Sequence, residues 1–146
     1  MLLDDLHKEW EIDSNIDSTN LGTESLNTPK LHSKYLRFLT ESKLTLRKAE
    51  SDFLRLRALK IRYYRGEMTK DELLAQKWNQ WQGNKPLKSE MDGILETDGD
   101  VIRADEKVSY HSAVVSALES ILKELNSRHW AIKSSIEYTK MQNGLI

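Results

Sequence analysis

The chain has 146 residues, the size of one ordinary domain, with 38% hydrophobic and 31% charged residues and a net charge of −1. The absence of cysteine excludes a disulfide framework and any thiolate metal site. The acidic N-terminus contains no apolar run long enough for a signal peptide or a membrane span, so we expect a cytosolic protein without a membrane partner.

The near-neutral total hides a strong segregation of charge along the chain. Residues 1–28 carry a net charge of −6, residues 29–66 carry +8, residues 67–106 carry −5 and residues 107–146 carry +2. A basic block between two acidic blocks indicates a polyanion site on an otherwise neutral particle. We expect one domain made of four segments: an acidic N-terminal segment at 1–28, a long basic helix at 29–66, a short helix and hairpin at 67–106, and a long C-terminal helix at 107–143.

The first predicted elements are a short amphipathic helix at 2–11 and a loop rich in Ser, Thr, Asn and Asp that ends near Thr28. Thr28 as the N-cap and Pro29 as the first helical residue predict the start of a helix. No further Pro or Gly follows until Gly66, which is typical of a helix terminator. The sequence therefore permits a helix of 37 residues, about 55 Å long.

The long predicted helix has a coiled-coil-like apolar seam with alternating steps of three and four residues. Ser42 and Lys60 are the polar residues that interrupt it. The apolar members of the seam are Leu31, Tyr35, Phe38, Leu46, Ala49, Phe53, Leu56 and Tyr63.

Basic residues of the same helix cluster on a different face. At 100° per residue, six of them fall within an arc of about 100°: Arg37, Arg47, Lys48, Arg55, Arg62 and Arg65. Such a row attracts phosphates, although a charged stripe on a long helix can also be a solvated face. This arc has no acidic residue near its centre, which favours nucleic acid. Tyr63 and Tyr64 beside the arc could stack on unpaired bases, although packing at an interface is the simpler interpretation.

The remaining segments complete a mainly helical pattern. Residues 69–82 predict a shorter helix in which Trp78 and Trp81 are core residues or, less simply, a stacking platform. Asp98-Gly99 between two short apolar runs predicts a small β-hairpin near 94–103. From about Glu106 the helical period returns and continues to Asn143-Gly144.

No motif argues for catalysis or for a cofactor. The four histidines lack ligand spacing, so we expect no metal site. No phosphate-cradling loop, nucleophile elbow or pair of acids with a partner histidine occurs in the sequence. We therefore expect a protein that is not an enzyme.

The chain also resembles a known family from end to end. Short matching pieces keep their order along almost the whole length: Leu3–Leu6, Ile16–Thr19 with Leu21, Ser33-Lys34 followed by an aromatic residue and leucine, Tyr63-Tyr64 with Gly66, Lys88–Met91, Asp100-Val101 with Asp105, and Ala131–Lys133. Together they resemble the UvsY family of recombination mediators of T-even-type bacteriophages. The segment 67–87 is longer than this resemblance predicts, so nothing can be carried over to it.

The resemblance implies a function that periodicity alone does not. It implies a protein without enzymatic activity that binds single-stranded DNA in the cytoplasm of the infected bacterial host. It implies two protein partners, the phage single-strand-binding protein and a RecA-like recombinase (UvsX), which is loaded onto covered strands in recombination, replication and repair. It further implies a homo-oligomeric ring with seven members.

The predicted DNA-binding residues come from two sources. The resemblance places the basic residues of the family just before the paired tyrosines, which makes Lys60 and Arg62 the candidates here. The charge pattern adds Arg55, Arg57, Arg65 and Lys48. A rival hypothesis is a structural or adaptor coiled-coil oligomer, whose basic face binds acidic protein partners or residues 1–28 of a neighbouring subunit.

Overall fold

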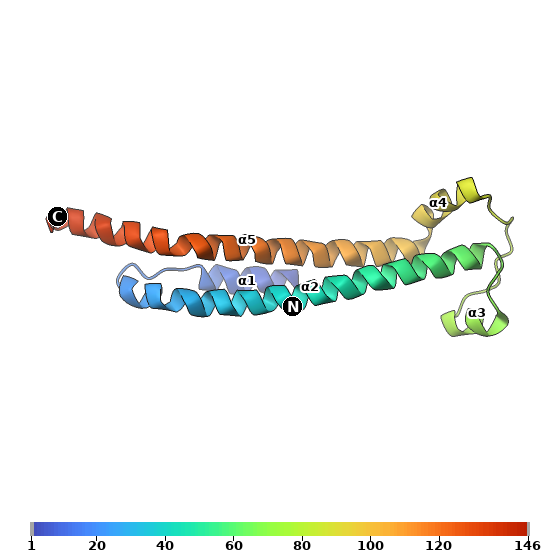
Figure 1. Ribbon diagram of the computed structural model, residues 1–146, viewed down its shortest axis with the longest axis horizontal. Coiled ribbons are helices and arrows are strands. Elements are labelled where there is room, and N and C mark those ends of the chain that lie inside the picture. The colour runs from blue at the N-terminus through green and yellow to red at the C-terminus, as the bar shows by residue number, and fades with distance from the viewer. Residues whose placement is uncertain (1, 146) are drawn as a thin grey trace. The chain divides into compact units, whose positions relative to one another are not determined.

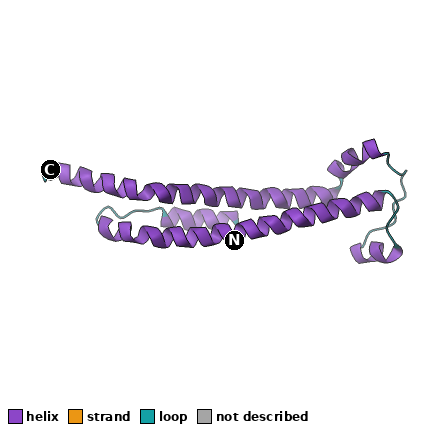
Figure 2. Ribbon diagram, viewed as in Figure 1, coloured by secondary structure: helices purple, strands orange, loops and turns teal. Residues whose placement is uncertain are grey.

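The computed structural model describes residues 2–145, and within that range it contains five helices and no strand (Figures 1 and 2). The prediction of a mainly helical chain with two long helices is confirmed. No helix among the described residues is both long and apolar enough to cross a membrane. The helices are α1 (Leu3–Asp13), α2 (Leu21–Tyr64), α3 (Lys70–Gln76), α4 (Lys88–Thr97) and α5 (Gly99–Gln142).

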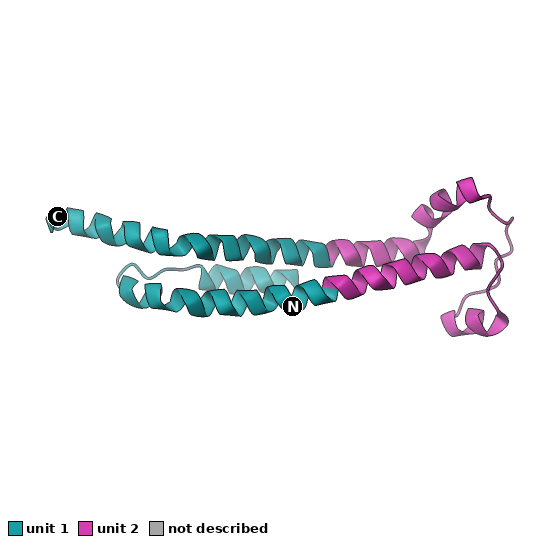
Figure 3. Ribbon diagram, in the orientation of Figure 1, with its two compact units in different colours: residues 1–45, 111–146 teal, residues 46–110 magenta. Residues whose placement is uncertain are grey.

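The chain divides into two compact units (Figure 3). Unit 1 consists of residues 1–45 and 111–146, and unit 2 of residues 46–110. Each unit contains part of α2 and part of α5, because these two 44-residue helices run through both. All of the predicted DNA-binding residues belong to unit 2.

Helix α2 begins eight residues before the predicted start at Pro29, so the interpretation of Thr28 as its N-cap is wrong. Pro29 lies inside the helix, where it removes one backbone hydrogen bond. Tertiary contacts of the first turns oppose this cost. Glu24 in the first turn forms an ion pair with Arg128 of α5, whose side chain is 6% exposed. Residues 21–28 are helical although their composition predicts a loop, and the partner of Glu24 lies more than a hundred residues away in the sequence. Residues 16–20 form a loop, as predicted.

The apolar core of unit 1 is made of residues from α1, α2 and α5. Lys34 of α2 forms ion pairs with two acidic residues of α1. Its ammonium lies 2.6 Å from a carboxylate oxygen of Glu9 and 2.6 Å from one of Asp13. The hydroxyl of Tyr35, a member of the predicted seam, donates to Asp13 over 2.8 Å. The buried core residues of this unit include Leu6, Leu31, Tyr35, Leu39, Val114, Val115, Leu118, Ile121, Leu122, Leu125 and Ile132.

The predicted β-hairpin near 94–103 is wrong, because this stretch is a junction between two helices. Helix α4 ends at Thr97, Asp98 is extended, and α5 begins at Gly99. Met91, Leu95 and Val101 are buried with Tyr64 in the core of unit 2. A short apolar run on either side of Asp-Gly fits a hairpin and a helix–helix junction equally well, and burial against α2 selects the junction here.

Helices α2 and α3 both end near a residue with a positive φ. The predicted terminator Gly66 follows α2 with φ +69°, and the amide of Glu67 donates back to the carbonyl of Arg62 over 3.0 Å, which closes the helix. Helix α3 stops at Lys77, which adopts φ 60°. The predicted helix at 69–82 is therefore shorter than expected, and its two tryptophans belong to an irregular stretch at 77–87.

Candidate nucleic-acid interface

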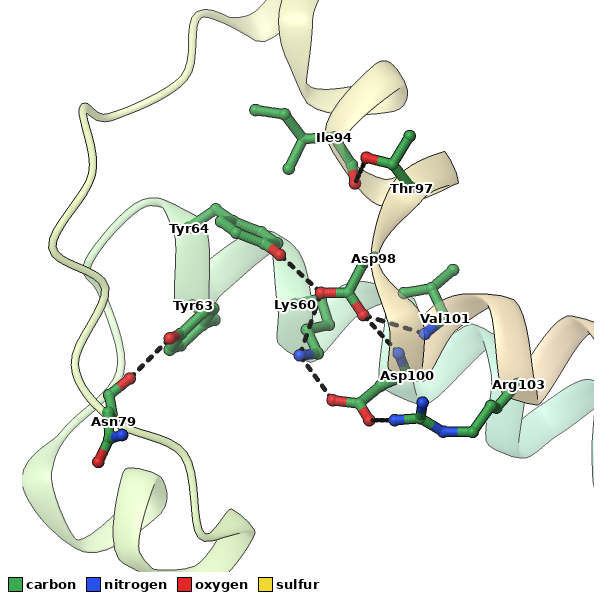
Figure 4. Close-up of polar contacts among 10 residues, drawn as sticks. All are labelled: Lys60, Tyr63, Tyr64, Asn79, Ile94, Thr97, Asp98, Asp100, Val101 and Arg103. Carbon is green, nitrogen blue, oxygen red and sulfur yellow. Dashed lines mark hydrogen bonds and ion pairs between the residues drawn. The ribbon is translucent and has the colours of Figure 1, made fainter.

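Lys60 lies inside unit 2, where two carboxylates share its ammonium (Figure 4). The Nζ atom is 3.1 Å from Oδ2 of Asp98 and 2.8 Å from Oδ2 of Asp100. It also lies 4.0 Å from the centroid of the Trp78 ring, a distance typical of cation–π contacts. Only 5% of the residue is exposed. Lys60 thus has internal partners in the free chain, and its contact with DNA stays a prediction.

Asp98 joins α2 to the start of α5. Its Oδ1 accepts hydrogen bonds from the amides of Asp100 and Val101 at 2.9 and 3.0 Å, which makes it the N-cap of α5. Its Oδ2 accepts the hydroxyl of Tyr64 at 2.6 Å as well as the Lys60 ammonium (Figure 4). Every lone pair of this buried carboxylate therefore has a donor, as a buried charge requires.

The same contacts shift the pKa values of these groups. Burial alone would raise the pKa of Asp98, but hydrogen bonds from Tyr64, Val101 and Lys60 outweigh it and lower the pKa below its usual value. The hydrogen bond and charge of Lys60 also lower the pKa of Asp100, against the effect of burial. Burial and the hydrogen bond to Asp98 raise the pKa of the Tyr64 hydroxyl.

The lowered pKa of Asp98 predicts an acid-dependent contribution to stability. A depressed pKa stabilises the fold at all pH values above that of the unfolded group, about 4, and the stabilisation is lost as the pH falls through the folded value. Asp98→Asn keeps an N-cap residue but removes the charge. We expect this variant to be less stable than the parent protein at pH 7, with a difference that shrinks below about pH 4. Urea unfolding at several pH values measures this difference, and a difference that widens in acid would contradict it. Asp71→Asn, on exposed α3, is the control.

Arg62 is held by an acidic residue of α3. Its Nη1 and Nη2 donate to the two carboxylate oxygens of Glu72 at 2.6 and 2.9 Å, a bidentate pair. Glu72 also completes a capping box with Thr69 at the start of α3. The hydrogen bond from Arg62 is the main reason why the pKa of Glu72 falls to about 2. The Arg62 side chain remains 43% exposed.

The paired tyrosines lie in an aromatic cluster with the two tryptophans of the 77–87 stretch. Tyr63 contacts Trp78 at a centroid distance of 5.4 Å, and its hydroxyl donates to the carbonyl of Asn79 over 2.6 Å. Tyr64 is buried and contacts Trp81 at 4.8 Å. The structure therefore packs both tyrosines inside unit 2, and base stacking by either of them stays a prediction.

The other predicted basic residues differ in whether they have a partner. Arg57 forms an ion pair with Asp92 of α4 at 2.8 Å. Lys48, Arg55 and Arg65 are exposed, and among residues 2–145 no carboxylate lies within ion-pair distance of them. Lys48, Arg55 and Arg62 are spaced by seven residues along α2, so they repeat on one helix face about every 10 Å.

The structure thus separates the six predicted cations into two sets. Lys60, Arg57 and Arg62 have acidic partners from α3, α4 and the start of α5, whereas Lys48, Arg55 and Arg65 face solvent. The sequence patterns did not indicate these acidic partners. The one signal for Lys60 was its place in the apolar seam, which indicates a buried position in need of a counter-charge.

Exposed cations without acidic partners among the described residues, Lys48 and Arg55 on one face of α2 and Arg65 just beyond its end, are a feature of nucleic-acid-binding proteins. The family model described as "Recombination, repair and ssDNA binding protein UvsY" matches residues 9–145. The chain therefore belongs to the UvsY family of recombination, repair and single-stranded-DNA-binding proteins, which confirms the resemblance noted in its sequence.

Individual relatives agree with the family assignment. The recombination protein uvsY of Enterobacteria phage T4 is 30% identical over 133 residues, which is 91% of both chains. A crystal structure of the bacteriophage T4 recombination mediator protein UvsY superimposes with a TM-score of 0.82 at 28% identity and covers 98% of each chain. A second crystal form of the same T4 protein gives a TM-score of 0.81 at 26% identity, over 97% of this chain and 99% of the other.

Proposed function

We propose that the chain is a recombination mediator that holds single-stranded DNA on the exposed basic face of α2 in unit 2. The observation that carries this proposal is the set of three exposed cations without carboxylate partners, Lys48, Arg55 and Arg65. The predicted cations Arg57, Lys60 and Arg62 already have acidic partners, so these three are the predicted cations that are available for phosphates. Arg62, half-exposed on the same face, is proposed as the fourth contact.

Lys60 has a different role in this proposal. Its ammonium stabilises the junction between α4 and α5 and so fixes the α2 surface from which Arg55 and Arg62 project. Arg57 stabilises the fold in a similar way through Asp92. Tyr63 is proposed to stack on a base only when its present aromatic neighbours move away.

A few phosphate contacts give weak binding, so the proposal includes repetition of the site in a ring of identical subunits. Large exposed apolar side chains on α2 and α5 support such an assembly, because exposed apolar patches mark interfaces. In unit 2 these include Leu54, 63% exposed, and Ile102, 39% exposed. The proposed ring has seven members, as the resemblance predicts.

The ring would bend the strand along repeated cationic sites, a path that the single-strand-binding protein tolerates poorly. A recombinase of the UvsX type, bound to the ring, then captures the released strand during recombination, replication and repair in the cytoplasm of the infected host. This role needs binding and assembly alone. It involves no catalytic step and no cofactor.

The rival proposal is an adaptor oligomer whose basic face binds acidic protein segments. The acidic N-terminal segment gives it some support, because Glu9 and Asp13 already pair with a lysine of α2. The two proposals differ in their response to a phosphate polymer: an adaptor gives no saturable binding of oligo-dT.

Reversal of two exposed cations tests the DNA site. The variant Lys48→Glu/Arg55→Glu is expected to bind labelled oligo-dT at least about tenfold more weakly near 0.1 M salt, with a log–log salt slope shallower by about 1.4, or 0.7 for each lost phosphate contact. Fluorescence anisotropy at several salt concentrations measures both quantities.

The matched control for this test is Lys107→Glu/Lys123→Glu, which makes the same change of net charge with two exposed lysines of α5. Neither lysine belongs to the proposed site, so their reversal should leave most of the affinity intact. Equal losses in both double variants would show that only the overall charge matters, and would refute the site on α2.

A further inference from the structure

Residues 67–87 fold back onto the end of α2 and cover part of its basic and aromatic surface. Helix α3 has no buried residue of its own. Polar and aromatic contacts hold the segment in place: Arg62 with Glu72, Lys60 with Trp78, Tyr63 with Asn79, and Tyr64 with Trp81. Each of these contacts uses an α2 side chain that is a candidate for DNA binding: the two cations for phosphates and the two tyrosines for possible base stacking.

Glu72 binds the Arg62 guanidinium in the way that a phosphate group would. A guanidinium recognises carboxylates and phosphates with the same fork of two parallel N–H donors, and Glu72 accepts both of them. With a pKa of about 2, Glu72 is ionised at every physiological pH. Arg62 is therefore paired with an anion of the same chain, whereas Lys48 and Arg55 of the same helix are exposed to solvent.

The ion pair that holds the segment to Arg62 is weak. A solvent-exposed ion pair contributes little to stability, and the Arg62 and Glu72 side chains are 43% and 32% exposed. A helix of seven residues is not stable on its own. Residues 77–87 have no regular secondary structure. A strand that presents several phosphates at once to α2 can therefore compete for Arg62.

We propose that Glu72 is an internal phosphate mimic, and that residues 67–87 form a cover which single-stranded DNA displaces from Arg62 and Tyr63. This proposal rests on the proposed DNA site. When the cover leaves, Arg62 gains a phosphate and one face of Tyr63 becomes free for a base. The cover restricts which anions bind, because a short or sparsely charged anion cannot replace all of the contacts that are lost when the cover is displaced.

Glu72→Gln is the variant that tests the cover, because glutamine keeps the capping box with Thr69 while the charge on Arg62 is released. We expect tighter binding of oligo-dT by about twofold to fivefold, the factor that the loss of one exposed ion pair allows. The control is Asp71→Asn, the adjacent exposed acid on α3, which has no ion-pair partner among the described residues. It makes the same change of net charge and is expected to give a smaller gain.

Hydrogen exchange of the unaltered protein gives a second readout. With oligo-dT bound, the amides of residues 70–76 should exchange faster than in the free protein, because displacement of the cover unfolds α3. Slower exchange there, or equal affinity gains in Glu72→Gln and Asp71→Asn, would overturn the cover even when oligo-dT binds well. If the unaltered protein does not bind oligo-dT at all, the proposed DNA site fails, and the cover fails with it.

Discussion

Replacement of Lys60 by Met is expected to lower the free energy of unfolding by about 3 kcal/mol, the low end of the range for removing one partner of a buried ion pair. Methionine keeps the length of the side chain but leaves the buried carboxylate of Asp98 without its cation. Asp98 is 8% exposed and cannot recover the lost interaction from water. The loss of the cation destabilises Asp100 less, because its side chain is one-third exposed and keeps its ion pair with Arg103.

Urea unfolding at one fixed protein concentration measures this effect, since assembly makes apparent stability depend on concentration. Lys48→Met is the control: it removes an exposed lysine of the same helix and is expected to change stability by less than about 0.5 kcal/mol. If Lys60→Met unfolds at the same urea concentration as the parent protein, the buried ion pair does not stabilise unit 2.

This prediction affects how a loss of DNA binding is interpreted. A Lys60 variant that no longer binds a strand could lack a phosphate contact or could lack a correctly folded junction between α4 and α5. Arg55 has no such structural contact among residues 2–145, so its substitution is not expected to disturb the fold. Lys60 and Arg55 variants should therefore be compared for stability before they are compared for affinity.

The second large effect is expected in unit 1, where Leu118→Ala should lower the free energy of unfolding by about 3 to 5 kcal/mol. Leu118 has no exposed surface and lies in the core that α5 forms with α1 and α2. Alanine removes several buried carbon atoms and leaves a cavity that long, regular helices cannot easily close.

Glu119→Ala is the matched control for this variant, because it introduces the same residue at the next, exposed position of the same helix. It is expected to leave stability within about 0.5 kcal/mol of the parent protein. Thermal and urea unfolding monitored by circular dichroism compare the two variants. A Leu118→Ala protein as stable as Glu119→Ala would mean that the core of unit 1 is not formed in solution as described.

Local sequence signals predicted the two long helices and the faces of α2. The spacing of the apolar residues placed Tyr35 and Ala49 on the packed side of α2, and both are buried. The 100° rotation per residue placed Lys48 and Arg55 on another face, and both are exposed. Gly66 marked the end of α2 because few other residues adopt a positive φ at low cost. These features depend on neighbours within a few turns, so they can be derived from the sequence alone.

Contacts between distant segments decided the rest. Pro29 lies inside α2, and the ion pair of Arg128 with Glu24 stabilises the turns before it. Asp98 caps a helix and does not form a hairpin turn, because Lys60 and Tyr64 of α2 bind its carboxylate. Which of the predicted cations has an acidic partner was decided in the same way: Glu72 and Asp92 pair with Arg62 and Arg57, whereas no acid within residues 2–145 reaches Arg55. Helical periodicity specifies the direction of a side chain, but only the tertiary structure brings its counter-charge within reach, since Coulomb attraction depends on distance in space and not on separation along the chain.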